Sequence, residues 1–293
     1  MVQDILKNTK NKVWPVIEKY LKDPSFPKEF QIGKKYNKEL DLYWKINREY
    51  PERKGKYLRP ALVLLTLEAL GRKDTFASKV AAAMQLSEDW ILIHDDIEDH
   101  SETRRNKPCL HKIYGEELAI NAGDTLNTIM WKIITDLGSE EISTEFYRIL
   151  MRTLLGQGVE QIWTNKNVNK MNNEDYFFIA DSKSGYYSIT GPMRLWAIAA
   201  GASKSQINKI TEFGLHLGRC FQLVDDILDI EQDKKEGKTT LATQKGADFA
   251  RKLATKEKEL AKEIFNKELS FLSNEPARTK LKELTDFILE RDY

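Results

Sequence analysis

Two acidic motifs of nearly the same sequence hold the residues of this chain that are best suited to chemistry. DDIED occupies residues 95–99 and DDILD occupies residues 225–229, and an apolar run precedes each. If these runs are helices, the first and fifth aspartates of each motif lie one turn apart on the same face. Carboxylates gathered in this way repel one another unless a cation neutralises them. Mg²⁺ suits such a site, because it binds carboxylate oxygens together with the phosphate oxygens of a substrate. The two motifs therefore predict a metal site that handles a diphosphate.

Basic and polar residues accompany both motifs along the chain. They are Lys56, Arg59, Arg104, Arg105, Lys183, Ser184, Gln222, Lys234, Lys235 and Lys238. The arginine pair follows the first motif closely enough to reach back to a phosphate bound there, and a planar guanidinium suits two phosphate oxygens at once. The segments GKYLRP and KSG stand at predicted helix starts, where backbone N–H groups also favour an anion. These residues predict that cations surround the bound diphosphate.

Length, charge and cysteine content exclude several classes of protein. The 293 residues are 41% apolar and 10% aromatic, enough for a large core. Lys and Arg number 46 against 45 Asp and Glu, so no nucleic-acid partner is expected. Cys109 and Cys220 form neither a disulfide framework nor a metal-ligand spacing. No apolar stretch is long enough for a signal peptide or a membrane span, so we expect a cytoplasmic protein without an integral membrane segment.

Helical periodicity runs through almost the whole chain. A period of about 3.6 residues fits residues 14–21, 59–70, 78–94, 118–137, 141–163, 184–200, 206–230 and 247–265. Alternating segments bounded by turn residues are absent, which favours an all-α fold. Pro60 is a typical residue at a helix start, and Gly71 is a typical residue just after a helix end. No Gly/Ser-rich or Pro-rich linker divides residues 1–293, so we expect one domain.

Several ordered blocks of this sequence resemble the trans-polyprenyl synthetase family, the head-to-tail isoprenyl diphosphate synthases. GKYLRP resembles the GKxxRP box of that family, and HDDIEDHSETRRNKPCLH resembles its first aspartate-rich motif with the arginine pair that follows. The blocks AINAGDTL, GQGVEQ, KSG and GRCFQLVDDILD match the others in the right order, and the resemblance runs from Gly55 to about Ala250. It implies an all-α helical bundle around a central cavity, the isoprenoid synthase type I fold. It also implies a homodimer that uses Mg²⁺.

The same resemblance implies a prenyltransferase that condenses isopentenyl diphosphate with an allylic diphosphate to give an all-trans prenyl diphosphate. By analogy, the ligands of three Mg²⁺ ions are Asp95 and Asp99 for two ions and Asp225 for the third. The cations expected on the leaving diphosphate are Arg104, Lys183 and a lysine of the 234–238 loop, for which Lys238 is the candidate. Those expected on isopentenyl diphosphate are Lys56, Arg59 and Arg105. The catalytic residues expected beside the developing carbocation are Lys183, Ser184 and Gln222.

Three departures from the family pattern concern the substrate sites. Glu88 stands where many members carry a histidine or glutamine that helps to bind isopentenyl diphosphate. An anion there opposes a diphosphate unless a cation intervenes, so Glu88 either pairs with Lys56 or Arg59 or weakens the site. Asn106 replaces the usual glycine after the arginine pair, and asparagine is suited to a left-handed turn. The 230–241 segment is shorter than usual, which leaves the match of Lys238 to one of two family lysines open.

The length of the product depends on the residues just before the first motif. Ile91 and Trp90 lie four and five residues before Asp95, which is roughly 6–7.5 Å deeper along a helix axis. In the family a bulky residue in this region forms the floor for the growing prenyl tail. Trp90 and the absence of an insertion between Asp96 and Asp99 resemble archaeal-type geranylgeranyl diphosphate synthases. A C20 product is therefore favoured, with C15 next.

Three alternative functions stay open from the sequence. A class I terpene cyclase shares the first aspartate motif, but it usually carries an Asn/Ser/Glu metal motif in place of DDILD at 225–229. A catalytically impaired regulatory subunit of a prenyl diphosphate synthase would explain Glu88 and the short 230–241 loop. A structural helical protein without a ligand would leave the clustered acids without a partner.

Overall fold

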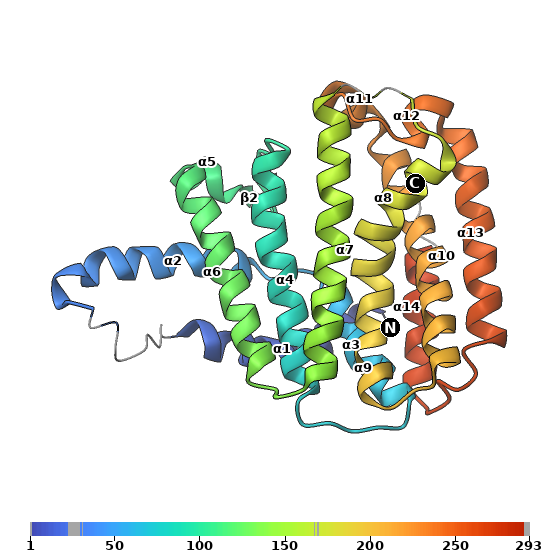
Figure 1. The fold of residues 1–293 in the computed structure, drawn as a ribbon, viewed down its shortest axis with the longest axis horizontal. Coiled ribbons are helices and arrows are strands. Elements are labelled where there is room, and N and C mark those ends of the chain that lie inside the picture. Colours follow the sequence, from blue (N-terminus) through green and yellow to red (C-terminus); the bar gives the residue numbers. More distant parts are fainter. Residues whose placement is uncertain (1, 23–29, 31, 167, 169, 290–293) are drawn as a thin grey trace. The chain divides into compact units, whose positions relative to one another are not determined.

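The computed structural model describes residues 2–22, 30, 32–166, 168 and 170–289, and these are almost entirely helical (Figure 1). The strands within these ranges are the two-residue segments β1 (Thr103–Arg104) and β2 (Lys107–Pro108), which pair antiparallel. The all-α fold predicted from the sequence is confirmed. No helix in the described ranges is both long and apolar enough to span a membrane.

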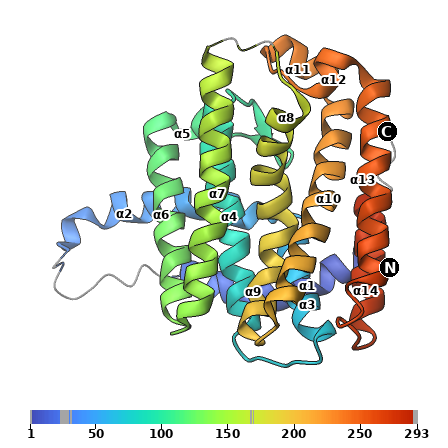
Figure 2. The same cartoon turned by 45° about the vertical axis from the view of Figure 1, so that its right-hand side comes forward.

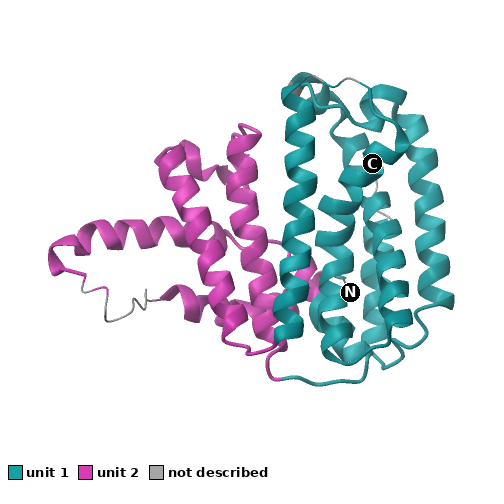
Figure 3. Cartoon of the chain, in the orientation of Figure 1, with its two compact units in different colours: residues 1–2, 62–74, 140–293 teal, residues 3–61, 75–139 magenta. Residues whose placement is uncertain are grey.

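The chain forms two compact units, which Figure 3 distinguishes by colour. Unit 1 comprises residues 1–2, 62–74 and 140–293, and unit 2 comprises residues 3–61 and 75–139. The first aspartate motif belongs to unit 2 and the second belongs to unit 1. The single domain expected from the sequence stays a prediction.

Unit 2 is built on the packing of α4 against α6. Its helices are α1 (Val2–Lys22), η2 (Lys34–Tyr36), α2 (Asn37–Arg53), α4 (Ala77–Glu98), α5 (Leu110–Tyr114) and α6 (Glu116–Thr135). An alanine run in α4 favours the helix and packs with none of its surface exposed, at residues 81–83. Gly123 of α6 allows a close approach, because a Cβ atom there would lie 2.3 Å from His94 Nε2. This packing holds the last turns of α4, which carry the first motif.

The tight turn between β1 and β2 places the arginine pair of unit 2. Arg105 and Asn106 both have positive φ angles, 54° and 62°, as a two-residue hairpin turn of type I′ requires. Asparagine adopts this conformation more readily than most residues. The expectation that Asn106 replaces glycine in a left-handed turn is therefore confirmed. Arg105 adopts the same region without that advantage, so its side-chain contacts must hold it there.

Unit 1 is built around α10, which packs against η3 on one side and α13 on the other (Figure 2). Its helices are α7 (Glu140–Asn165), α8 (Asn173–Ala180), η3 (Asp181–Thr190), α9 (Gly191–Ala199), α10 (Lys204–Leu228), α11 (Ile230–Glu236), α12 (Leu241–Lys245), α13 (Ala247–Lys267) and α14 (Ala277–Leu289). A capping box of Ser203 and Gln206 starts α10. The second motif lies at its far end. The remaining helix, α3 (Leu58–Ala69), runs from unit 2 into unit 1.

The segment that carries Lys183 and Ser184 differs from the prediction. The sequence predicted a helix start at these residues, but the helical run begins earlier, at a capping box of Asn172 and Asp175. Within that run, η3 is a π-helix, and π-helical turns are often found at functional sites. A Cβ atom on Gly218 would lie 2.2 Å from the Cα atom of Gly185, so α10 and η3 touch backbone to backbone. The wider π turn therefore sits where the two helices approach most closely.

Candidate active site

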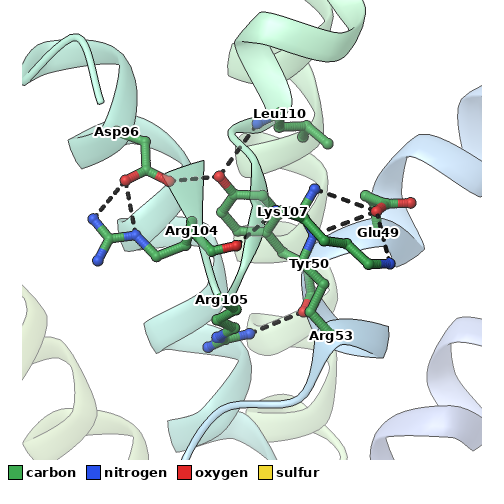
Figure 4. A network of polar contacts seen from close by, with 8 residues as sticks. All are labelled: Glu49, Tyr50, Arg53, Asp96, Arg104, Arg105, Lys107 and Leu110. Carbon is green, nitrogen blue, oxygen red and sulfur yellow. Dashed lines mark hydrogen bonds and ion pairs between the residues drawn. The ribbon is translucent and has the colours of Figure 1, made fainter. Parts of the chain in front are cut away.

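The first motif contains one buried aspartate. Asp96 has no exposed surface, whereas Asp95 and Asp99 are partly exposed. One carboxylate oxygen of Asp96 accepts a hydrogen bond from the Tyr50 hydroxyl, and the other accepts from Arg104 Nε at 2.9 Å and from Arg104 Nη2 (Figure 4). Burial and the neighbouring Asp96 raise the pKa of Tyr50, which keeps its hydroxyl a donor. Asp96 therefore anchors the motif and leaves Asp95 and Asp99 as the candidate metal ligands.

Arg104 was expected to contact the leaving diphosphate, and the structure places its guanidinium on Asp96. Burial acts to lower the pKa of Arg104, but the ion pair with Asp96 outweighs it and raises the pKa overall. The backbone is held as well, because Arg53 Nη1 donates to the Arg104 carbonyl at 3.0 Å. Arg53 in turn pairs with Glu49 at 3.2 Å, as Figure 4 shows. Arg104 is thus fixed on Asp96, the residue that follows Asp95 in the first motif.

Two of the cations expected on isopentenyl diphosphate meet at Glu88. Arg59 Nη1 lies 3.2 Å from one oxygen of Glu88, and Arg105 Nη2 lies 3.7 Å from the other. Of the alternatives that the sequence left open for Glu88, the structure shows the contact with Arg59, and the contact with Arg105 was not foreseen. Asp89 was also missed: it is 1% exposed and lies 2.8 Å from Arg105 Nη1. Burial raises the pKa of Asp89 to about 6, against the opposing effect of Arg105. Lys56 is exposed.

The second motif lines a cavity of about 170 Å³ in unit 1. Four residues proposed from the sequence contribute to its wall, namely Lys183, Gln222, Asp225 and Lys238. Further acids of the wall are Glu160, Asp226, Asp229 and Asp233. Asp233 is mostly buried and adds an acid that follows the second motif in the chain. The cavity therefore carries more carboxylates than lysines and suits added cations.

Asp226 of unit 1 resembles Asp96 of unit 2, because each is a buried second aspartate that accepts a hydrogen bond from a tyrosine hydroxyl. It is 4% exposed, and its two oxygens accept hydrogen bonds of 2.7 Å, one from the Tyr176 hydroxyl and one from Gln222 Nε2. The Ser184 hydroxyl donates to the amide oxygen of Gln222. Burial raises the pKa of Asp226 to about 7, although both hydrogen bonds act to lower it. Ser184 and Gln222 therefore belong to the chain of hydrogen bonds that fixes the second motif.

Lys183 has an acidic partner that the sequence did not reveal. Its ammonium group pairs with Glu160 of α7. Glu160 lies in the GQGVEQ block, but no spacing in the sequence marks it as the partner of a lysine 23 residues later. The pair brings a cation and an anion together on the wall of the cavity, where both are partly exposed.

The donor chemistry of both motifs fits Mg²⁺. Within the described ranges, no group of three or more His, Cys, Asp or Glu side chains stands ready to enclose a metal ion. Mg²⁺ does not require such a group, because it keeps water ligands and binds through one or two carboxylates plus substrate phosphates. Asp95, Asp99 and Asp225 are partly exposed, and Asp229 is exposed, so their carboxylates are accessible. Each motif could hold Mg²⁺ together with the phosphate oxygens of a substrate.

The two candidate floor residues lie on different faces of α4. Trp90 is 6% exposed, and its ring packs edge to face with His94 at 5.7 Å between centroids. His94 in turn lies 3.2 Å from the Ile120 carbonyl of α6, so this face turns toward α6. Helical geometry sets Ile91 about 40° from Asp95 around the axis, and Trp90 about 140° away. Ile91 thus shares the face of the metal motif, and the floor role of both residues stays a prediction.

Comparison with known proteins accounts for this arrangement. Residues 41–268 match the family model described as polyprenyl synthetase, which covers more than half of the chain. The chain belongs to the polyprenyl synthetase family. The resemblance inferred from the ordered blocks is confirmed, and so is the predicted enzyme class, a prenyltransferase.

Two relatives of this synthetase family member cover most or all of its length. It is 30% identical to a farnesyl diphosphate synthase of Geobacillus stearothermophilus, across 81% of this chain and 78% of the relative. It is 27% identical to a geranylgeranyl pyrophosphate synthase of Geoglobus acetivorans, across 100% of both chains. The solved structure of the geranylgeranyl pyrophosphate synthetase from that archaeon superimposes with a TM-score of 0.82 at 26% identity, covering 98% of this chain and 100% of the other. The isoprenoid synthase fold is therefore confirmed.

Proposed function

We propose that this protein condenses isopentenyl diphosphate with an allylic diphosphate and releases a short-chain all-trans prenyl diphosphate. A C20 product is favoured and C15 is next. The observation that carries the proposal is the matched construction of the two aspartate motifs. In each, a tyrosine hydroxyl holds the buried second aspartate, and the first stays partly exposed. Partly exposed carboxylates of this kind can bind Mg²⁺ together with the phosphate oxygens of a substrate. We also propose a cytoplasmic location.

In the proposed reaction, the bond between C1 and oxygen of the allylic diphosphate breaks, and its electron pair leaves with the diphosphate. The double bond of isopentenyl diphosphate attacks C1, and a proton then passes from the condensed product to the departing diphosphate. Magnesium ions held by Asp95, Asp99 and Asp225 would supply positive charge to the leaving group when bound. Three ions are proposed with the diphosphate.

The residues of the chain itself serve to bind and to neutralise. Lys183 and Lys238 lie on the wall of the cavity, where they would compensate the charge that develops on the leaving diphosphate. When the diphosphate binds, the ammonium group of Lys183 would leave Glu160 and pair with a phosphate oxygen. Arg104 would contribute from its fixed place beside Asp95. Ser184 and Gln222 support the second motif through Asp226, so we propose that they position the site rather than react.

Release of pyrophosphate tests the part played by the motifs. With isopentenyl diphosphate, an allylic primer and Mg²⁺, Asp95→Asn and Asp225→Asn should each lower the rate by about 10²–10³-fold, because each removes a preorganised charge partner of the transition state. Asp248→Asn is the matched control, since it removes an exposed carboxylate on α13 that lies 3.1 Å from Arg251. Wild-type rates in either motif variant would contradict the proposal.

We further propose that the protein is a homodimer. Large apolar side chains on one side of α7 are exposed, namely Tyr147, Met151, Leu154, Leu155 and Ile162. Their spacing of three, four and seven residues follows a single helical stripe. The segment 129–137, considered as a dimer seam from the sequence, instead contributes Met130, Ile133 and Ile134 to the core of unit 2. Light scattering should give twice the chain mass, and Leu154→Glu should shift it toward the monomer.

A further inference from the structure

Glu88 lies between two arginine side chains of unit 2. One of its oxygens is 3.2 Å from Arg59 Nη1 and the other is 3.7 Å from Arg105 Nη2. The three residues come from α3, α4 and the turn between β1 and β2. The side chain of Glu88 is 16% exposed, so water screens these charges only in part. A single carboxylate thus spans both guanidinium groups.

The two terminal nitrogens of Arg105 have different surroundings. Nη1 donates to the Tyr50 carbonyl at 2.9 Å and lies 2.8 Å from the buried Asp89. Nη2 is buried and makes no hydrogen bond within the described part of the chain. Arg105 is therefore anchored through Nη1, while Nη2 faces Glu88. The unused donor of Arg105 is directed at the space that the Glu88 carboxylate fills.

The charges of this cluster balance without a ligand. Arg59 and Arg105 contribute two positive charges, and Glu88 and Asp89 contribute two carboxylates. Asp89 is engaged in holding Arg105, so its removal would disturb the anchor. Glu88 makes two longer contacts within the part of the chain that the structure describes, so it is the carboxylate that a phosphate would replace. A phosphate oxygen that bridged both guanidinium groups would need the position of the Glu88 carboxylate.

We propose that Glu88 weakens the binding of isopentenyl diphosphate, because it competes with the diphosphate of that substrate for Arg59 and Arg105, the two arginines that the family resemblance assigns to it. This inference rests on the proposed function, which supplies the identity of the acceptor. The competition weakens binding of isopentenyl diphosphate and leaves binding of the allylic substrate unchanged. Replacing Glu88 by glutamine removes the charge and keeps the shape of the side chain, so the arginines become available to the substrate.

Titration calorimetry on the full-length wild type and Glu88→Gln tests the proposal directly. The Kd and the KM for isopentenyl diphosphate should both fall about five- to tenfold in the variant, while the KM for the allylic diphosphate stays the same. Glu102→Gln is the matched control, because it removes the same charge from unit 2 at a side chain that is 77% exposed and pairs with Lys112. That control should bind isopentenyl diphosphate as the wild type does.

Unchanged or weaker binding of isopentenyl diphosphate by Glu88→Gln would overturn the proposal. Glu88→Asp provides a second variant, which keeps the charge and should show no tightening. A failure of the proposed function would be seen separately, as the absence of prenol from the wild type with every allylic primer. If the wild type makes no prenol, titration with inorganic pyrophosphate still tests the competition at Arg59 and Arg105, because this measurement needs no turnover. Tighter binding by Glu88→Gln than by the wild type supports competition, and equal binding refutes it.

Discussion

The hydroxyl of Tyr176 donates a 2.7 Å hydrogen bond to Asp226, and that pair is repeated by Tyr50 and Asp96 in the other unit. In both motifs the second aspartate is buried, whereas the first is partly exposed. A buried carboxylate must be hydrogen-bonded, or its desolvation destabilises the fold. The tyrosines meet this requirement and, in doing so, fix the orientation of the last helical turn before each candidate metal ligand.

Loss of the Tyr176 hydroxyl should therefore affect both stability and activity. We expect Tyr176→Phe to lower the free energy of unfolding by about 1–3 kcal/mol, because a buried acceptor loses a donor. It should also raise the Mg²⁺ concentration needed for half-maximal activity. Tyr186→Phe is a matched control in the same unit, since Tyr186 donates to Glu145, away from the motif. Equal Mg²⁺ dependence in the two variants would show that Tyr176 is only structural.

Ionisation of Asp226 should make stability fall as the pH rises. Burial raises the pKa of Asp226 to about 7 in the folded protein, from the model-compound value of 3.8. The folded state then holds a proton that the unfolded state releases, so this contribution to stability is fully present below pH 3.8 and is lost as the pH rises to about 7. Asp226→Asn removes the ionisable group and with it this pH-dependent contribution to stability. Urea unfolding at pH 5 and pH 7.5 should show a smaller pH-dependent decrease in the variant than in the wild type. Equal decreases would contradict the assignment.

Gly55 should be needed for the position of Arg105. A Cβ atom on Gly55 would lie 2.9 Å from Arg105 Nη2 and 3.3 Å from Gln85 Nε2, so the arginine side chain would have to move. We expect Gly55→Ala to weaken binding of isopentenyl diphosphate by about tenfold, or ~1.4 kcal/mol, with little change in the melting temperature. Gly158→Ala is the control, because its Cβ atom meets nothing within 4 Å. Calorimetry with both variants decides the case, and equal affinities would refute the prediction.

The floor of the product site can be located by truncating each candidate. Ile91→Ala should lengthen the prenol product and leave the fold intact, because Ile91 is partly exposed on the face of Asp95. Trp90→Ala should also lengthen the product, as the sequence predicts, but should lower the free energy of unfolding by about 3–5 kcal/mol, because the ring is buried. Product sizing and thermal melts measure both effects. An unchanged product in both variants would remove these residues from the floor.

The sequence predicted the parts of this site whose spacing follows helix geometry. Both motifs end long helices, α4 and α10, and Lys183, Gln222, Asp225 and Lys238 line one cavity. Residues four apart on a helix lie on the same face regardless of the rest of the fold, so the clustering of the aspartates can be predicted from the sequence. The pairing of Glu88 with Arg59 was among the alternatives that the sequence offered, because an anion beside predicted cations is expected to pair with one of them.

The anchoring of the motifs could not be predicted, because it depends on contacts far apart in the chain. Tyr50 lies 46 residues from Asp96, and Tyr176 lies 50 residues from Asp226. One signal was available: the second residue of each motif is turned about 100° from the first around the helix, toward the core. Helix α2 was missed because it is charged and buries few side chains. The π turn of η3 has no side-chain pattern that distinguishes it from an α-helix.

Sizing the product tests the central claim most directly. The purified wild type is incubated with isopentenyl diphosphate, Mg²⁺ and, separately, C5, C10 and C15 allylic diphosphates, and the products are dephosphorylated and sized. The account predicts a C20 or C15 prenol with Mg²⁺ and none when EDTA removes the metal. A cyclic hydrocarbon would instead place the protein among the terpene cyclases. The absence of product from every primer would contradict the account and favour a regulatory subunit.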